Sequence, residues 1–158
     1  GGRLMHLERK IETVLKAAIV AGVAGLIEGV AVSVRTYWSD ADDIEDRDDA
    51  VLQMPCVFAQ AHPSSRETLN MPQRSVPIDI AIATQCEDDL ARANLGAIYS
   101  KVRHLIETTS FDLGELVQFG GIEMPSPGQA TVDEATMRNL CTFTVNMILC
   151  AESSEDHA

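Results

Sequence analysis

The 158-residue sequence contains none of the short motifs that mark common catalytic or redox sites. No CxxC pair occurs among its four cysteines, which excludes a zinc ribbon or a redox couple of that type. A GxSxG nucleophile elbow is also absent, and no glycine-rich phosphate cradle joins the strand and helix expected between residues 75 and 108. Aromatic residues make up only 4% of the chain, so no aromatic platform for single-stranded nucleic acid is present.

Positive charge is scarce. The chain has 12 Lys and Arg residues against 24 Asp and Glu residues, for a formal net charge of −12. This balance argues against nucleic-acid binding through phosphate contacts and against adhesion to an anionic membrane. The apolar segment 17–27 is too short to span a bilayer, and we expect a helix end and a turn there. No signal peptide is evident.

The length fits one ordinary domain. We interpret residues 1–4 as a cloning remnant and Met5 as the native start. Residues 5–150 are expected to form a single α+β domain, and residues 151–158 a polar, disordered tail. We expect most of Cys56, Cys86, Cys141 and Cys150 to be buried free thiols.

The most informative segment is a strand followed at once by a helix. In residues 76–83, Ile78, Ile80 and Ile82 fall on one side, which is the period of two of a half-buried strand. From residue 88 to residue 108, apolar residues recur at steps of three and four, which is one face of a helix. The helical stripe comprises Ala91, Leu95, Ile98, Val102 and Leu105. A strand with a helix laid across it indicates a two-layer protein.

Similar patterns predict the other elements. An apolar stripe over residues 4–21 predicts a first helix, whose polar face would carry Glu8, Arg9, Lys10, Glu12 and Lys16. Alternation predicts further strands at 30–38, 51–61 and 138–150, and a short one within 116–124. The predicted fold is a mixed or antiparallel sheet of about four to five strands packed by two main helices, with loops at 39–50, 62–75 and 124–137.

An acidic run is the most unusual local composition. Seven of the eleven residues from Ser39 to Asp49 are acidic. The run lacks the glycine and the terminal glutamate of a calcium-binding hand loop, so a solvated loop is the simpler interpretation. A third interpretation is a negative surface in a multi-subunit ring. Candidate interface residues in this run and the next loop are Asp40, Asp42, Asp43, Glu45, Asp46, Asp48, Asp49, His62, Arg66, Asn70 and Arg74.

No residue is assigned a catalytic, cofactor-binding or metal-binding role. His62 precedes Ser64 and Ser65, but local neighbours do not make a triad, which needs a base, an orienting acid and an oxyanion pocket together in space. Asp79 lies on the less apolar side of its strand, where we expect it to pair with an arginine, such as Arg35, or to face a subunit interface. His104 is expected on the surface of the second helix.

The order of elements resembles that of the tail terminator, or tail completion, proteins of long-tailed bacteriophages. The features that carry the resemblance are the opening helix Leu7–Ala21, the strand Val30–Trp38, the Met54-Pro55-Cys56-Val57-Phe58 strand, the Val76–Ala83 strand, the helix Asp89–Glu107 and the closing strand Leu140–Leu149. The resemblance extends over nearly the full length. It rests on this pattern, since the family has no diagnostic catalytic motif, and no site residue can be transferred from it.

The resemblance implies a structural virion protein in the tail or neck, made in the bacterial host cytoplasm. Such minor tail proteins form a hexameric ring from copies of one chain. The ring caps the tail tube and provides the head–tail joining surface, so its partners would be the tail tube protein and the head–tail connector. DNA would pass through without specific binding. Six copies at −12 each would carry a total of −72, and the hypothesis is that residues 40–49 of each copy line the lumen. The resemblance implies no cofactor, no enzyme activity and no membrane.

Two other functions remain open from the sequence. The chain is also compatible with a small cytoplasmic α+β module that binds a ligand or a protein, and that could be dimeric. A metal-dependent hydrolase that uses Asp79 or the acidic run is the third alternative.

Overall fold

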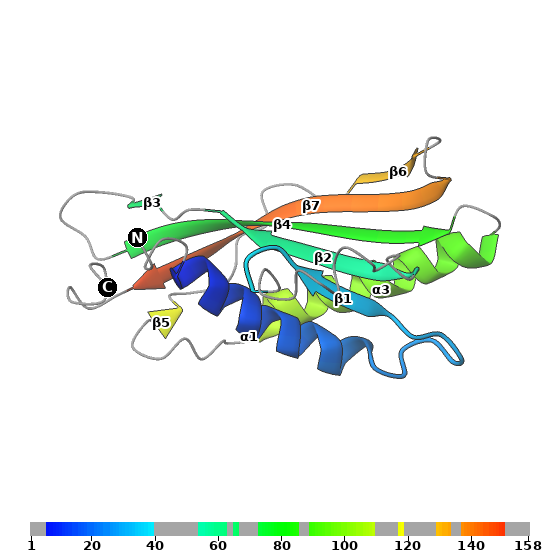
Figure 1. Cartoon of the computed structure of the whole chain (residues 1–158), viewed down its shortest axis with the longest axis horizontal. Helices are drawn as coiled ribbons and strands as arrows, with labels where there is room; N and C mark the ends of the chain where they lie inside the picture. The colour runs from blue at the N-terminus through cyan, green and yellow to red at the C-terminus, as the bar shows by residue number, and fades with distance from the viewer. Residues whose placement is uncertain are drawn as a thin grey trace.

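The computed structural model describes residues 6–39, 54–62, 65–66, 73–85, 89–109, 117–118, 129–133 and 137–150. These residues form two layers, a long twisted sheet and two helices that lie on one of its faces (Figure 1). The elements, in chain order, are α1 (His6–Val23), β1 (Ser33–Thr36), β2 (Cys56–Ala61), β3 (Ser65–Arg66), β4 (Gln73–Gln85), α3 (Asp89–Thr108), β5 (Val117–Gln118), β6 (Gln129–Asp133) and β7 (Arg138–Cys150).

The sheet is mixed, and its main path runs in the order β1-β2-β4-β7-β5. β1 pairs parallel with β2, and the other pairings are antiparallel. The longest pairing joins β4 to β7, from Gln73 opposite Cys150 to Gln85 opposite Arg138. β3 adds to β4, and β6 adds to β7 on the side away from β4. The sheet therefore ends in β1 on one side and, at one end of β7, in β6 on the other.

Each helix buries one stripe against this sheet. In α1 the buried residues Ile11, Leu15, Ile19 and Val23 recur every four positions, as one face of a helix requires. After this stripe ends, Gly25 has a φ of 70°, a left-handed conformation that glycine adopts without steric penalty and that commonly ends helices. The buried stripe of α3 consists of Leu95, Ile98, Val102 and Ile106.

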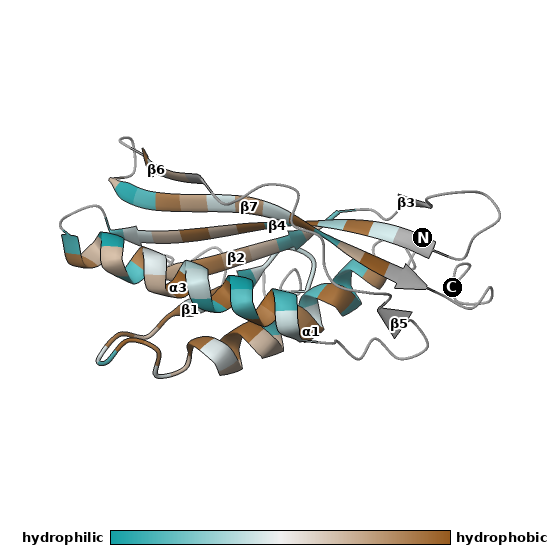
Figure 2. Cartoon of the chain, turned by 180° about the vertical axis from the view of Figure 1, so that it is seen from behind, coloured by the Kyte–Doolittle hydropathy of each residue, from teal (hydrophilic) through white to brown (hydrophobic). Residues whose placement is uncertain are grey.

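The core lies between the helices and one face of the sheet. Alternate residues of β4, Ile78, Ile80 and Ile82, are at most 1% exposed. Burying each such side chain contributes roughly 1.5–3 kcal/mol. Figure 2 shows the same division, with apolar residues frequent along β2, β4 and β7 and polar bands alternating with apolar ones along both helices. Strand residues of the core also include Val57, Ala59, Ala61, Val76, Phe143, Val145 and Met147.

The two helices approach each other closely at Gly22. A Cβ atom at that position would lie 2.2 Å from Leu105 Cδ1 of α3, which is closer than real contacts allow. Glycine therefore permits α1 to pack on the second half of α3. Leu105 is partly exposed and fills this inter-helix contact, while Ile106 takes the place in the buried stripe that the sequence pattern gave to Leu105.

The structure confirms the predicted α+β single domain with two main helices and a mixed sheet. Three predictions were wrong. The loop expected at 124–137 contains β6, and the short β3 lies in the loop expected at 62–75. Glu8 and Glu12, assigned to the polar face of α1, are 6% and 0% exposed. The expected cloning remnant at 1–4 and the expected polar tail at 151–158 lie outside the described residues.

Candidate functional site

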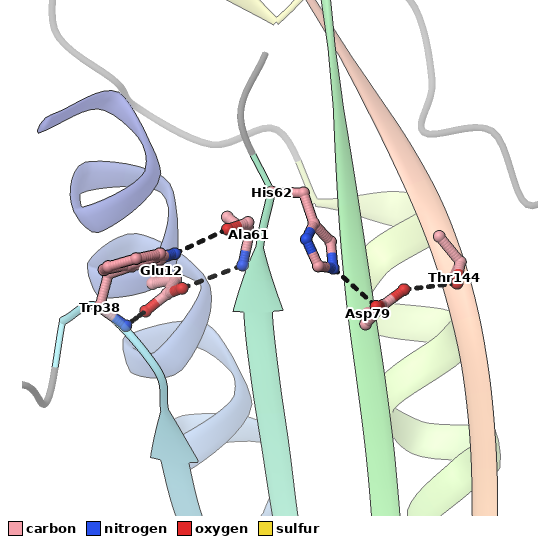
Figure 3. A network of polar contacts seen from close by, with 6 residues as sticks. All are labelled: Glu12, Trp38, Ala61, His62, Asp79 and Thr144. Carbon is pink, nitrogen blue, oxygen red and sulfur yellow. Dashed lines mark hydrogen bonds and ion pairs between the residues drawn. The ribbon is translucent and has the colours of Figure 1, made fainter. Parts of the chain in front are cut away.

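A buried carboxylate joins α1 to the ends of two strands (Figure 3). Glu12 Oε1 accepts hydrogen bonds from the backbone N–H groups of Trp38, at 2.6 Å, and Ser39, at 2.8 Å. Its second oxygen, Oε2, accepts one from the backbone N–H of Ala61 at 2.9 Å. The carboxylate has no access to water, and these hydrogen bonds from backbone N–H groups compensate for the free-energy cost of burying it.

The indole of Trp38 completes this network. Its Nε1–H donates to the carbonyl oxygen of Ala61 at 2.9 Å, and its ring stands edge-on to Tyr37 at a centroid distance of 4.6 Å. Ala61 is therefore held through both its N–H, by Glu12, and its C=O, by Trp38. The network fixes the chain where it leaves β1, directly before the acidic run that begins at Asp40.

A second polar cluster crosses the face of the sheet that neither helix covers (Figures 1 and 3). Asp79 of β4 lies between His62, just after β2, and Thr144 of β7. His62 Nε2 is 2.6 Å from Asp79 Oδ2, and Thr144 Oγ1 donates to Asp79 Oδ1 at 2.6 Å. The side chains of His62 and Asp79 are 37% and 54% exposed, so this is a surface cluster. It replaces the predicted pairing of Asp79 with Arg35.

The order of contacts in this cluster does not suit nucleophilic catalysis. In a catalytic triad the histidine bridges the nucleophile and the acid, because it must take the hydroxyl proton. Here the carboxylate of Asp79 is the central group, and the Thr144 hydroxyl donates to it rather than to His62. Partial burial raises the pKa of Asp79, but the hydrogen bonds from Thr144 and His62 and the charge of His62 outweigh it and hold that pKa below its ordinary value. Asp79 is therefore an ionised acceptor at neutral pH.

A groove of about 450 Å³ lies between α3 and the edge of the sheet at β6. Its sides are mainly apolar or small, and Tyr99 on one side stands edge-on to Phe143 at 5.4 Å. At the same end of the molecule Leu90, Val132 and Met137 are 67%, 53% and 60% exposed. The residues that line the groove are Arg92, Leu95, Gly96, Tyr99, Ala130, Thr131, Val132, Asn139 and Cys141.

Most of the predicted interface residues lie outside the described residues. These are Asp40, Asp42, Asp43, Glu45, Asp46, Asp48, Asp49 and Asn70. Of the others, His62 contacts Asp79, and Arg66 of β3 is the cross-strand neighbour of Arg74 of β4. The register thus places Arg66 opposite Arg74, and the role of these residues and of His62 in an interface stays a prediction.

Sequence reasoning missed both Glu12 and the groove. Glu12 lies directly after Ile11, a residue of the buried stripe of α1. Glu8 and Glu12 are four residues apart and so share one side of the helix, which could have indicated two acids beside that stripe. The groove depends on β6, whose sequence Gln129-Ala130-Thr131-Val132-Asp133 alternates only briefly. Cys141 lines the groove, and both Cys56 and Cys141 are buried free thiols, which confirms the prediction for these two cysteines.

Among the described residues, no three His, Cys, Asp or Glu side chains are grouped so as to hold a metal ion. His104 is exposed on α3, as predicted. A search of the described helices finds none with the length and apolar character needed to cross a membrane.

Comparison with known protein families finds no family profile that matches the chain. A search of curated protein sequences also finds no match. Solved structures do match. One is a chain of the virion of a native gene transfer agent particle, with a TM-score of 0.59 and 10% sequence identity, and the alignment covers 88% of this chain and 93% of that one. At this identity the likeness concerns the fold, and it includes nearly the whole of both chains.

Proposed function

We propose that this chain is a structural protein of a phage-like virion, and that it acts as a tail terminator. In this role copies of the chain form a ring, most simply a hexamer, that caps the tail tube and provides the surface to which the head connector binds. The observation that carries the proposal is the shared fold with a gene transfer agent virion chain over 88% of this chain and 93% of that one. The shared fold supports a structural virion protein, and the finer role of tail terminator is supported by the order of elements in the sequence, which resembles that of tail terminator proteins.

The chemistry of the polar clusters supports a role without catalysis. The Glu12 carboxylate is buried and directed at backbone N–H groups, so it is unavailable to a substrate. The exposed cluster places an ionised Asp79 between its partners, so that the Thr144 hydroxyl donates to a carboxylate rather than to His62. These arrangements hold strands together, which is what a subunit that works by shape requires.

The capping mechanism is geometric. A ring subunit offers one face to the last ring of the tube and a different face to the connector. Polymerisation stops because the exposed face no longer presents the surface that another tube subunit needs. The acidic run at 40–49 would contribute a negative surface past which DNA slides without sticking.

Deletion of the gene in the strain that produces the particles tests the proposal. Tubes that are not capped should continue to grow, so electron microscopy should show tails of irregular, excessive length that carry no heads. A plasmid copy of the gene should restore tails of uniform length. Tails of normal length with heads attached in the deletion strain would contradict the proposal.

The groove favours a second candidate, a module that binds a small apolar ligand. Its volume of about 450 Å³ lies within the roughly 300–1,000 Å³ of ligand pockets, and its sides are mostly apolar. A normal phenotype in the deletion experiment, together with a ligand that copurifies in the groove, would favour this candidate.

A further inference from the structure

We propose that the β6 edge of one copy of this chain pairs with the β1 edge of a second copy, and that the groove between α3 and β6 receives the side of α1 that lies next to β1 in that second copy. The inference deepens the proposed function and rests on it, because it names the contact that would join ring subunits. Among the described strands, β1 pairs only with β2, and β6 pairs only with β7. Both are therefore edges of the described sheet, and such edges are templates for pairing with another chain.

The two edges lie at the same level of the sheet. Val34 of β1 is opposite Val57 of β2, which is opposite Ile82 of β4. Ile82 is in turn opposite Cys141 of β7, and Cys141 is opposite Ala130 of β6. One line across the sheet thus joins β1 to β6. A second copy placed beside the first in the same orientation continues that line.

The strand directions and lengths of the two edges match. β1 is parallel to β2, and each further step, from β2 to β4, from β4 to β7 and from β7 to β6, reverses the direction. β1 and β6 therefore run in opposite directions, so the added pairing between two copies in the same orientation is antiparallel. Antiparallel pairs are the commoner kind and slightly more stable per residue. β1 has four residues and β6 has five.

The backbone of β1 directs a donor to the outer edge. The N–H groups of Ser33 and Tyr37 donate inward, to the carbonyl oxygens of Pro55 at 3.0 Å and Ala59 at 3.1 Å. Successive N–H groups of a strand point to opposite sides, so the N–H of Val34 points away from β2. A strand beside β1 would therefore meet a hydrogen-bond donor there.

The side chains of the two edges alternate in step. Val34 is 9% exposed and belongs to the core on the helix side of the sheet. Ala130 and Val132 lie opposite Cys141 and Asn139 and line the groove with them, so they face the same side. When β1 joins β6, the apolar rows of the two copies therefore meet. Both copies then keep their helices on one face of the combined sheet, as each copy has them alone (Figure 1).

One side of α1 lies next to β1 and is apolar at the surface. Thr13 Oγ1 donates to Ser39 Oγ at 3.2 Å, which places this side beside the chain that leaves β1. Val20 follows Thr13 by seven residues, about two turns, so it lies on the same side, and it is 47% exposed. Gly22 faces Leu105 of α3. Two residues rotate a helix by roughly 200°, so Val20 points away from α3.

The groove offers space for this side of α1. Within one copy α1 packs on β1 and β2, and α3 packs on β4 and β7, which leaves Val132 of β6 53% exposed. A specific contact buries about 800 Å² on each partner, more than two short edge strands supply by themselves. Val20 of the second copy, seated in the groove of about 450 Å³, would add apolar area next to the strand pairing.

The contact is head-to-tail. Each copy has its β1 edge on one side of the sheet and its β6 edge on the other, so both can be used at once. Repetition of such a contact generates a ring or a filament rather than a closed dimer.

Two substitutions test the two halves of the contact. Gly96 lines the groove and a Cβ added there meets nothing within 4 Å, so Gly96→Leu should fill the groove without strain within the subunit. Val20→Lys places a charge on the side of α1 that would enter the groove. The matched controls are Gly96→Ala, which adds too little volume, and Ala21→Lys, which places the same charge at the next exposed residue, on another side of α1. Circular dichroism melts check that all of these full-length variants fold.

Sedimentation velocity over a range of protein concentrations gives the masses of the assemblies. Gly96→Leu and Val20→Lys should each weaken self-association by roughly tenfold or more, whereas both controls should associate like the wild type. A mixture of the two weakened variants contains one intact groove, in Val20→Lys, and one intact α1 side, in Gly96→Leu. The mixture should therefore form a heterodimer that does not extend.

Several results would overturn the inference. Association of Gly96→Leu that matches the wild type would exclude the groove, and unimpaired association of Val20→Lys would exclude the α1 side. A wild-type monomer at every concentration would exclude a contact between copies. A wild-type assembly that stops at two copies, or a mixture that gives no heterodimer, would exclude the head-to-tail arrangement. A small molecule that copurifies with the wild type and is lost from Gly96→Leu, while association is unchanged, would assign the groove to a ligand instead.

The tail lengths in the deletion strain judge the proposed function separately. A capping protein whose copies contact each other elsewhere would still produce overlong tails when its gene is deleted. Conversely, normal tails in the deletion strain would contradict the capping role even if the copies associate through β1 and β6.

Discussion

The carboxylate of Glu12, on the first helix, accepts a hydrogen bond from the backbone N–H of Ala61, 49 residues further along the chain and 2.9 Å away. Ala61 ends β2, and the same carboxylate binds Trp38 and Ser39 after β1. One buried side chain thus connects the helix layer to two parallel strands.

Replacement of Glu12 should be costly. Glu12→Ala leaves three backbone N–H groups without this acceptor, so the free energy of unfolding should fall by about 3 kcal/mol or more. Urea denaturation followed through Trp38, the one tryptophan of the chain, measures it. Val20→Ala, on the exposed side of the same helix, is the control and should change stability by about 0.5 kcal/mol or less. Equal effects of the two substitutions would show that the Glu12 network contributes little.

Acid should weaken the Asp79 cluster. Its folded pKa lies below the ordinary value of 3.8, so its contribution to stability is present above that value and is lost as the pH falls through the folded pKa. The contribution is small, about 1 kcal/mol or less, because the side chain is 54% exposed. The difference in unfolding free energy between the wild type and Asp79→Asn should therefore shrink below pH 3.8. A difference that grows as the pH falls would contradict this assignment.

Two glycines should respond differently to the same substitution. Gly96→Ala should stabilise the protein by about 0.5–1 kcal/mol, because alanine is the better helix former and the added Cβ has room. Gly22→Ala should give no such gain, since its Cβ would displace Leu105 and disturb the packing of the two helices. Thermal melts of both variants measure the difference. A larger gain at Gly22 than at Gly96 would contradict the close helix contact.

The buried thiols should be protected in the folded protein. Burial raises the pKa of Cys141, and it raises that of Cys56 against the lowering effects of the Arg138 charge and a hydrogen bond to the backbone of Ala83. Few thiolates then exist at neutral pH, so maleimide should label both on the order of tenfold or more slowly than a cysteine placed at exposed Ala97. Mass spectrometry of the digested protein measures the extent of labelling at each cysteine over time. Rapid labelling of Cys141 in the native state would show that its site opens readily.

The sequence was sufficient for the architecture because periodicity follows burial. Ile78, Ile80 and Ile82 face the helices in the structure, as their alternation predicts, and α1 and α3 begin and end within about two residues of the predicted bounds. Glu12 shows where periodicity fails. Its helical position lies beside the buried stripe, and only the tertiary placement of three N–H groups makes burial of a charge favourable.

The candidate sites depended on contacts between distant segments, which a single sequence does not reveal. Asp79 and Thr144 belong to β4 and β7, and His62 follows β2, so their cluster depends on a register that places Asp79 opposite Thr144. Arg35 was a reasonable partner for Asp79 by charge alone, but its register partner is Phe58. The groove likewise required the pairing of β6 with β7, because Ala130 and Cys141 meet only in that pairing.

The position of the chain within an assembled particle tests the central claim most directly. Cryo-electron microscopy of particles from the producing strain, with the chain identified by a specific antibody fragment, should locate a single ring at the head end of the tail tube. Six copies of the 17.1 kDa chain would give this ring a mass of about 103 kDa. Absence of the chain from the particles, or its distribution along the whole tube, would contradict a role as the tail terminator.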